Sequence, residues 1–243
     1  MPIGQRNSTA AQLHEIRFRQ TKLEWEKYFS GNPDIDLSVI PQAIFDSWQR
    51  CRNAGLNHLK KPVTPVLSGS GLQSLLEKNR LLLNACLPVI HHFDQHADST
   101  DFILSLFNRQ GYLLEVLVDP ADKLSAQSLC LIPGALWSEE ALGSNSPGSV
   151  LIQQKPVRFF GPQHYNENFH SLTASSVPIF DPQGNLLGGI SLITHYRDDC
   201  PTLAMAVTMS QAIENSLKAN EALQEARIAA YYQQTINDAV AEA

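Results

Sequence analysis

Two β-hairpin patterns constrain the fold of this chain more than any other feature. They lie at 102–118 and 175–194, with turns at Asn108–Gly111 and Asp181–Gly184. β-rich runs around a four-residue turn that contains glycine are typical of antiparallel strand pairs. Pro178 cannot donate a ladder hydrogen bond, so we expect its strand to lie at a sheet edge or to begin there.

Helical periodicity dominates the rest of the chain. Apolar spacing predicts helices at 10–29, from an N-cap at Ser38 to Gly55, at 72–87, and from Pro201 onward. Pro88 is expected to kink or interrupt the third helix. The last helix carries a seam of mostly small side chains at three- and four-residue spacing: Leu203, Ala206, Ser210, Ile213 and Leu217. Such a seam fits either pairing with a second copy or packing on the helix's own domain.

The order of these elements indicates the fold class. Helices come first, then an antiparallel sheet with interleaved helices and a short strand candidate at 157–160, then a long exit helix. This order is that of an α+β protein. We expect an amino-terminal helical region at 1–70, a central domain at 71–200 and an exit helix at 201–243.

Composition and charge exclude several classes of protein. Hydrophobic residues make up 43% of the chain and charged residues 17%, so a core can form. The formal net charge is −6 and the longest basic stretch is Lys60-Lys61, whereas DNA-binding domains usually carry a basic stripe. No apolar run approaches the roughly 20 residues that span a bilayer, the start lacks a signal-peptide pattern, and the four scattered cysteines suit reduced intracellular thiols. The sequence predicts a soluble cytoplasmic protein that contacts neither DNA nor membrane.

The sequence contains no recognisable catalytic or cofactor motif. G-x-S-x-G, H-E-x-x-H and a glycine-rich phosphate loop after a strand are all missing. His92 and His96 have a spacing that can share a metal on a helix, but a polar helix end in solvent is the favoured explanation. Cys86 and Cys130 lie in apolar runs and are expected to be buried structural thiols, and no feature marks Cys200 as activated. We expect no enzyme activity, no cofactor and no metal.

The segment between the hairpins, 134–176, has the composition of a ligand-binding region. It mixes hydroxyl residues, aromatics and a few strong polar groups, as small-molecule pockets do. Loop residues and helix caps explain the same composition equally well. In the ligand-binding interpretation, the contacts come from eight residues: Trp137, Phe169 and His170 as pocket walls, and Glu139, Asn145, Ser149, Thr173 and Ser175 as polar groups. Glu139 has an alternative role, in which its carboxylate caps or braces its own loop.

Four stretches carry a resemblance to a known family. In chain order they are Ile44–Cys51 followed by Gly55-Leu56 (I-x-x-S-W-x-R-C and G-L), Trp137–Ser146 (W-S-E-x-x-x-G-T-N-A), Gly161–Tyr165 (G-x-E-H-F), and Leu172–Gly189 (L-T-C-S-A-A-P-I-x-D-x-x-G-x-L-L-G). Together they resemble the AcoR/DhaR-type activators of σ54-dependent transcription over residues 38–220. The chain departs from the family pattern in the segment that we interpret as pocket wall, at Ser144, Ser146, Pro147 and Ala174.

This resemblance implies a GAF fold, with an antiparallel sheet of about six strands, helices on one face and a ligand cavity on the other. It implies that the chain is the effector-sensing part of a longer regulator, followed by an AAA+ ATPase and a helix-turn-helix domain. Contacts with σ54-RNA polymerase and with DNA would then be made only by those further domains. A homodimer through the terminal helices is expected.

Three hypotheses about function follow from these patterns. In the first, a small metabolite, neutral or weakly polar, binds between the sheet and Trp137–Ser176, and thereby shifts the exit helix. In the second, the input is a metabolic enzyme subunit that binds the domain as a protein partner. The third is a GAF-fold methionine sulfoxide reductase, which needs a reactive and a resolving cysteine where only Cys130 is even remotely placed.

Overall fold

The central element of the molecule is an antiparallel sheet. The computed structural model describes residues 3–32, 34–96, 102–195 and 201–241. Within them the sheet has five strands in the order β2-β1-β5-β4-β3, one fewer than the expected number of about six. The strands are β1 (Ile103–Asn108), β2 (Leu113–Leu117), β3 (Val157–Phe160), β4 (Leu172–Phe180) and β5 (Leu186–His195).

Both predicted hairpins are present, as β1–β2 and β4–β5. The expectation for Pro178 needs correction, because β4 is an interior strand between β5 and β3. Strand β3 pairs only with residues 173–176 of β4. Pro178 therefore lies where β4 has no neighbour on the β3 side, and its missing N–H costs the sheet no hydrogen bond there.

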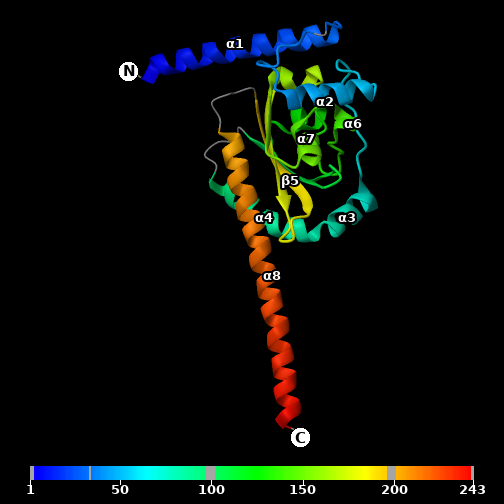
Figure 1. The fold of residues 1–243 in the computed structure, drawn as a ribbon, viewed down its shortest axis with the longest axis vertical. Helices are drawn as coiled ribbons and strands as arrows, with labels where there is room; N and C mark the ends of the chain where they lie inside the picture. Colours follow the sequence, from blue (N-terminus) through cyan, green and yellow to red (C-terminus); the bar gives the residue numbers. More distant parts are fainter. Residues whose placement is uncertain (1–2, 33, 97–101, 196–200, 242–243) are drawn as a thin grey trace.

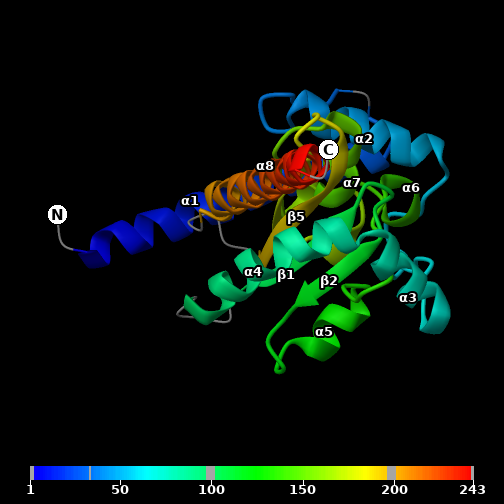
Figure 2. The ribbon, with the colours of Figure 1, turned by 90° about the horizontal axis from the view of Figure 1, so that it is seen from below.

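Helices pack against one face of the sheet, which we call the helix face. They are α3 (Gly69–Lys78), α4 (Arg80–His96) and α8 (Thr202–Ala241), and Figure 2 shows α4 and α8 on one side of the strands with α6 and α7 on the other. The expected helix 72–87 is thus two helices that meet at Asn79, whose side-chain amide donates to the Leu75 carbonyl. Pro88 does not end α4, which continues to His96.

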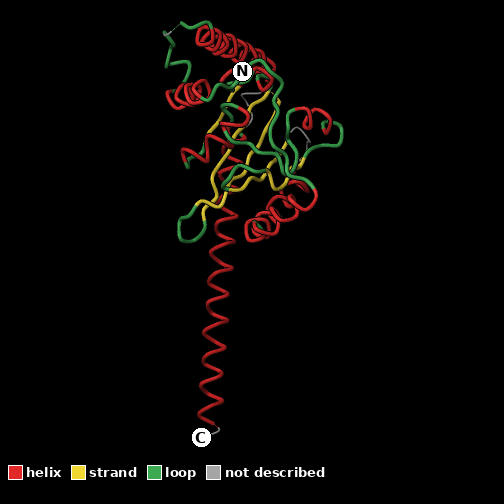
Figure 3. The backbone as a smooth tube through the Cα atoms, turned by 90° about the vertical axis from the view of Figure 1, so that its right-hand side faces the viewer, coloured by secondary structure: helices red, strands yellow, loops and turns green. Residues whose placement is uncertain are grey.

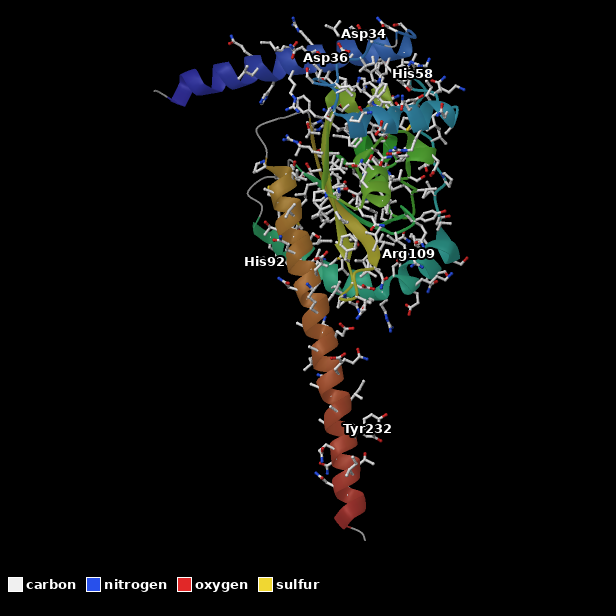
Figure 4. All side chains as sticks on the ribbon, viewed as in Figure 1. Asp34, Asp36, His58, His92, Arg109 and Tyr232 are labelled. Atoms are coloured by element: carbon white, nitrogen blue, oxygen red, sulfur yellow. The ribbon has the colours of Figure 1, made fainter. Side chains whose placement is uncertain are left out.

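The exit helix α8 divides into a packed part and a free part. Its seam faces the sheet and α4, and Leu217 is the last residue of α8 that lies in the core. Beyond it the helix makes a further hydrogen bond, from the Gln183 side chain of the β4–β5 turn to Glu221. It then extends away from the domain (Figure 3), and Tyr232 points into solvent (Figure 4). The seam thus packs on its own domain, which is one of the two arrangements that the sequence allowed.

The opposite face of the sheet, which we call the cover face, lies beneath the segment between the hairpins. Its elements are α5 (Lys123–Ser128), α6 (Glu139–Leu142), α7 (Ser146–Gln153) and the 3-10 turns η1 (Gly161–Gln163) and η2 (Glu167–Phe169). A large apolar cluster fills the space between these elements and the strands, with Phe107, Phe159 and Ile193 from the sheet side.

Two amino-terminal helices lie across the end of the sheet (Figure 1). They are α1 (Ile3–Phe29) and α2 (Gln42–Asn53). The α2 helix begins at Gln42 with Pro41 at the cap position, so the predicted N-cap at Ser38 is wrong. Ser38 instead hydrogen-bonds to the Asp36 carboxylate in a turn. The Trp25 and Trp48 indole N–H groups donate to the carbonyls of Tyr165 and Gln163, at 3.1 and 2.7 Å, and so join both helices to the central segment.

Candidate functional site

Strand register divides the polar side chains of β4 between the two faces of the sheet. Alternate residues of a strand point to opposite faces. The Ser175 hydroxyl lies 2.8 Å from that of Thr202 at the start of α8, whereas the Ser176 hydroxyl donates to that of Ser146 at the start of α7, also at 2.8 Å. Ser175 and Thr173 therefore face α8. We expected both residues to line a pocket beneath the Trp137–Ser176 segment. They point instead to the other face of the sheet, because neighbouring residues of a strand point in opposite directions.

A row of serines takes their place on the cover face. Ser105, Ser191 and Ser176 are cross-strand neighbours on β1, β5 and β4, and all three are fully buried. Ser176 is hydrogen-bonded to Ser191 as well as to Ser146. Ser105 ends this serine row, and its hydroxyl has no hydrogen-bond partner. A buried hydroxyl without a partner is costly, so an unpaired one in a row of paired hydroxyls marks free bonding capacity.

A narrow crevice opens on the cover face beside the serine row. It lies between α5 and the ends of β1, β4 and β5, and Ile103, Leu172 and Ile193 are among the residues that line it. Ile103 and Ile193 are each two residues from a serine of the row, on the same face. The interior volume of the crevice is about 10 Å³, which is room for about one water molecule. A metabolite would therefore have to move the lining side chains apart.

The carboxylate of Glu139, which we predicted to contact a ligand, is hydrogen-bonded to other groups of the protein. Its carboxylate accepts hydrogen bonds from the hydroxyls of Ser47 and Ser149, both at 2.7 Å, and from two guanidinium nitrogens of Arg50, at 2.9 and 3.1 Å. The Glu139 side chain is only 3% exposed. The hydrogen bond to this carboxylate raises the pKa of Arg50. Glu139 thus braces the segment against α2, as its alternative role supposed.

Asn145 and Gly148 hold the start of α7 tightly against α6. The Asn145 side-chain oxygen accepts from the Gly148 N–H at 2.8 Å and caps α7, while its amide donates to the Gly143 carbonyl at 2.7 Å. A Cβ at Gly148 would lie 2.7 Å from the backbone nitrogen of Glu139. Only glycine lets α7 approach α6 this closely.

The three predicted aromatic walls all lie in the interior. Trp137 and Phe169 are 3% and 1% exposed, with ring centroids 5.5 Å apart. The His170 ring instead meets Trp25 of α1 edge-on, at 4.8 Å. Burial lowers the pKa of His170 to about 3 and that of the neighbouring His164 to about 4. Of the eight predicted residues, Trp137, Glu139, Asn145, Ser149 and Phe169 are brought together on the cover face, His170 lies toward α1, and two face α8.

Sequence reasoning missed the serine row and the partners of Glu139. Ser176 and Ser191 lie on predicted strands, and the alternation of those strands could have separated Ser176 from Ser175. The partners Ser47 and Arg50 lie in the motif at 44–51, which was recognised without a role for its polar residues.

The described cysteines are poor nucleophiles. Burial raises the pKa of Cys51 to about 11, that of Cys86 to about 12 and that of Cys130 as well, and a thiol with a raised pKa forms little of the reactive thiolate. Cys86 is buried as expected, whereas Cys130 is only half-buried. Cys200 lies outside the described residues.

Neither a metal site nor a membrane span is found within the described part of the chain. No three His, Cys, Asp or Glu side chains there could hold a metal ion. His92 is exposed near the end of α4 (Figure 4), and the side chain of His96 lies outside what the structure describes. No described helix is long and apolar enough to cross a bilayer.

Comparison with known proteins identifies a group of regulators. No protein-family model matches the chain. It is 30% identical, over 76% of its length, to an uncharacterised 47.3 kDa protein encoded in the thcA 5′ region of Rhodococcus erythropolis, and covers 43% of that protein. It is 26% identical, over 81% of its length, to the acetoin dehydrogenase operon transcriptional activator AcoR of Bacillus subtilis, and covers 33% of it. The chain thus spans about a third to two fifths of these relatives.

A solved structure shows the same fold. It is that of the complex between DhaR(N) and DhaL of Escherichia coli, with a TM-score of 0.76 and 18% identity over 80% of this chain and 67% of that one. The relatives in sequence are AcoR-like transcriptional activators. The chain is therefore similar in sequence to AcoR-like transcriptional activators and has the GAF-like fold of DhaR(N).

Proposed function

We propose that this chain is the effector-sensing part of a σ54-dependent transcription activator, and that a small neutral or weakly polar metabolite binds on the cover face. The unpartnered, fully buried hydroxyl of Ser105 carries this proposal. It stands at the end of the serine row and close to a crevice whose lining is mostly apolar. A crevice lined mostly by apolar side chains, with a free hydroxyl close by, suits a small alcohol or ketone.

In the longer protein, such a ligand would act by favouring one arrangement of the domain. The crevice is nearly closed, so binding selects a conformation in which α5 and the strand ends lie further apart. The ligand can shift that equilibrium only by its difference in affinity for the two states, and about 1.4 kcal/mol of difference is a tenfold shift. The proposed output is control of an AAA+ ATPase through α8.

Isothermal titration with small alcohols, ketones and aromatics tests this proposal. Replacing Ser105 with alanine should weaken binding of a hydroxyl-bonding ligand about tenfold, because one hydrogen bond is lost. The matched control is Ser210→Ala, which removes a serine hydroxyl on the helix face that donates to the Pro178 carbonyl. Equal affinity in the Ser105 variant and the parent chain for every ligand that binds would contradict the assignment of this site.

A protein input is the second candidate function, and two observations favour it. The solved structure with the same fold contains DhaR(N) together with DhaL. On α1, Leu13, Ile16 and Leu23 are between 52% and 60% exposed and lie at three- and seven-residue spacing, which places them on one side of the helix. We propose that this side of α1 is where an enzyme subunit would bind.

Transcription from a reporter promoter by the full-length regulator separates the two candidates. A Leu13→Glu, Ile16→Glu double variant should abolish the response if the input is a protein and leave it intact if the input is a metabolite. Ser105→Ala should weaken the response if the input is a metabolite and leave it intact if the input is a protein.

A homodimer through the free part of α8 belongs to the same proposal. Leu223, Ile228, Tyr231 and Ile236 are all about half or more exposed there, and a lone helix with exposed apolar side chains is stabilised by a partner helix. Sedimentation of the chain and of a form that ends after Leu217 should show a dimer and a monomer respectively.

A further inference from the structure

Two buried threonines on the helix face have no hydrogen-bond partner. Thr173 is fully buried and Thr194 is 3% exposed, and neither hydroxyl is bonded to any other group. They are directly opposite each other on β4 and β5. Because opposed residues of neighbouring strands point to the same face, the two hydroxyls lie side by side. Two adjacent unpaired hydroxyls are a costly feature that a bound polar group would relieve.

The first turn of α8 is directed at these threonines. Thr202, Ser210 and Glu214 of α8 contact Ser175, Pro178 and Phe180 of β4 in that order, so the helix runs parallel to the strand. It begins level with Ser175, and Thr173 lies about 7 Å further back along the strand. The threonines therefore lie beyond the amino-terminal end of α8, on the face of the sheet that this helix covers.

The electrostatics of this place favour an anion. The N–H groups of a helix's first turn have no acceptor within the helix and carry a partial positive charge. Arg158 is the cross-strand neighbour of Ser175 on β3 and points to the same face. Arg17 of α1 lies 4.4 Å above the ring of Phe160, the cross-strand neighbour of Thr173. Hydroxyl donors, helix N–H groups and guanidinium groups are the usual partners of small oxyanions.

We propose that Thr173 and Thr194, with the first turn of α8, form a binding site for a small oxyanion, a carboxylate or phosphate group. Its two hydroxyls lie on the opposite face of the sheet from Ser105, and Thr194 also lines the end of the crevice that is proposed for the metabolite. The bound oxyanion would contact β4, β5 and the exit helix at once, and would thereby fix the position of α8 relative to the sheet. The chain would then have two inputs, of which this one acts on α8 directly.

Thermal unfolding of the purified chain tests the site with defined probes. Sodium acetate, sodium succinate and sodium phosphate are compared with sodium chloride at equal ionic strength, which removes general salt effects and separates carboxylate from phosphate. At roughly tenfold excess over Kd, the preferred oxyanion should raise Tm by about 4 °C. If none of the three raises Tm beyond the chloride value, the proposal is overturned.

Substitutions at the hydroxyls assign any shift to this site. Thr173→Val and Thr194→Val keep the shape of the side chain, and each should remove most of the Tm shift while leaving the ligand-free Tm equal or higher. Thr173→Ser keeps the hydroxyl and should retain the shift. Thr208→Val, on the exposed side of α8, is the matched control and should change nothing.

A shift that persists in both valine variants, or that serine and valine at 173 remove equally, would overturn the site. Binding of neutral ligands through Ser105 is measured separately, so failure of either proposal leaves the other open to its own test.

Discussion

The strongest polar groups of the cover and some hydroxyls of the sheet are buried in opposite ways. On the cover face, the Glu139 carboxylate and the Asn145 amide are saturated by groups of the protein itself. On the helix face, the hydroxyls of Thr173 and Thr194 are as deeply buried but have no partner. A network in which every polar group has a hydrogen-bond partner stabilises one conformation. A buried hydroxyl without a partner lowers the stability of the fold and can form a hydrogen bond with a bound molecule. The comparison suggests that the strongest polar residues hold the cover closed, while plainer hydroxyls are available to ligands.

The largest expected effect on stability comes from removing the central acceptor of the hydrogen-bond network on the cover face. Glu139→Ala removes the acceptor of Ser47, Ser149 and Arg50, and should lower the free energy of unfolding by about 3 kcal/mol. Urea denaturation measures this difference. The matched control is the exposed neighbour, Glu140→Ala, which should change stability by less than about 0.5 kcal/mol. Similar values for the two variants would mean that the network around Glu139 does not stabilise the cover.

The next largest effect is the loss of stability when buried histidines of the segment between the hairpins become protonated at low pH. His164 and His170 are buried as neutral rings, and their pKa values of about 4 and about 3 lie below the unfolded value near 6.5. Their contribution to stability is therefore complete above pH 6.5 and is lost as the pH falls toward 4. Between pH 7 and pH 5, His164 alone should cost about 2 kcal/mol of unfolding free energy.

Urea midpoints at the two pH values check this loss. The loss should be smaller in His164→Gln, which cannot be protonated in this range, and unchanged in His91→Gln, an exposed residue of α4. A wild-type midpoint that is the same at both pH values would contradict the burial of a neutral ring at 164.

The smallest effect sharpens the contrast within the helix face. Ser175→Ala removes a hydroxyl that is bonded to Thr202 and should lower the unfolding free energy by about 1 kcal/mol. Thr173→Val removes an unpartnered hydroxyl two residues away and should leave stability unchanged or raise it by about 0.5 kcal/mol. The sign of the difference is the test, and a loss of stability in both variants would show that Thr173 has a partner in solution.

Local patterns predicted the elements well. Both hairpins, the strand at 157–160, the end of α1 at Phe29 and the end of α2 just before Gly55 follow from periodicity and turn residues over short stretches. The errors are local as well. The α2 helix does not start at Ser38, whose hydroxyl is hydrogen-bonded to the Asp36 carboxylate in a turn.

The candidate site was predicted less well, because residue type does not fix direction. Thr173 and Ser175 were chosen as hydroxyl residues in a promising motif, yet one step of strand register turns such residues from one face to the other. Ser105 lies in a predicted strand, but a single serine among apolar residues carries no sequence pattern that would mark it as a binding residue.

By itself, the sequence determined which segments form strands and helices and which group of regulators the chain resembles, because these depend on short-range spacing and on motifs. Only the tertiary structure decided what the motif residues do. Glu139 meets Ser47 and Arg50 across 92 and 89 residues of chain, and Thr173 meets Thr194 only through strand pairing. Saturation of a buried polar group depends on such distant partners, and no local pattern encodes them.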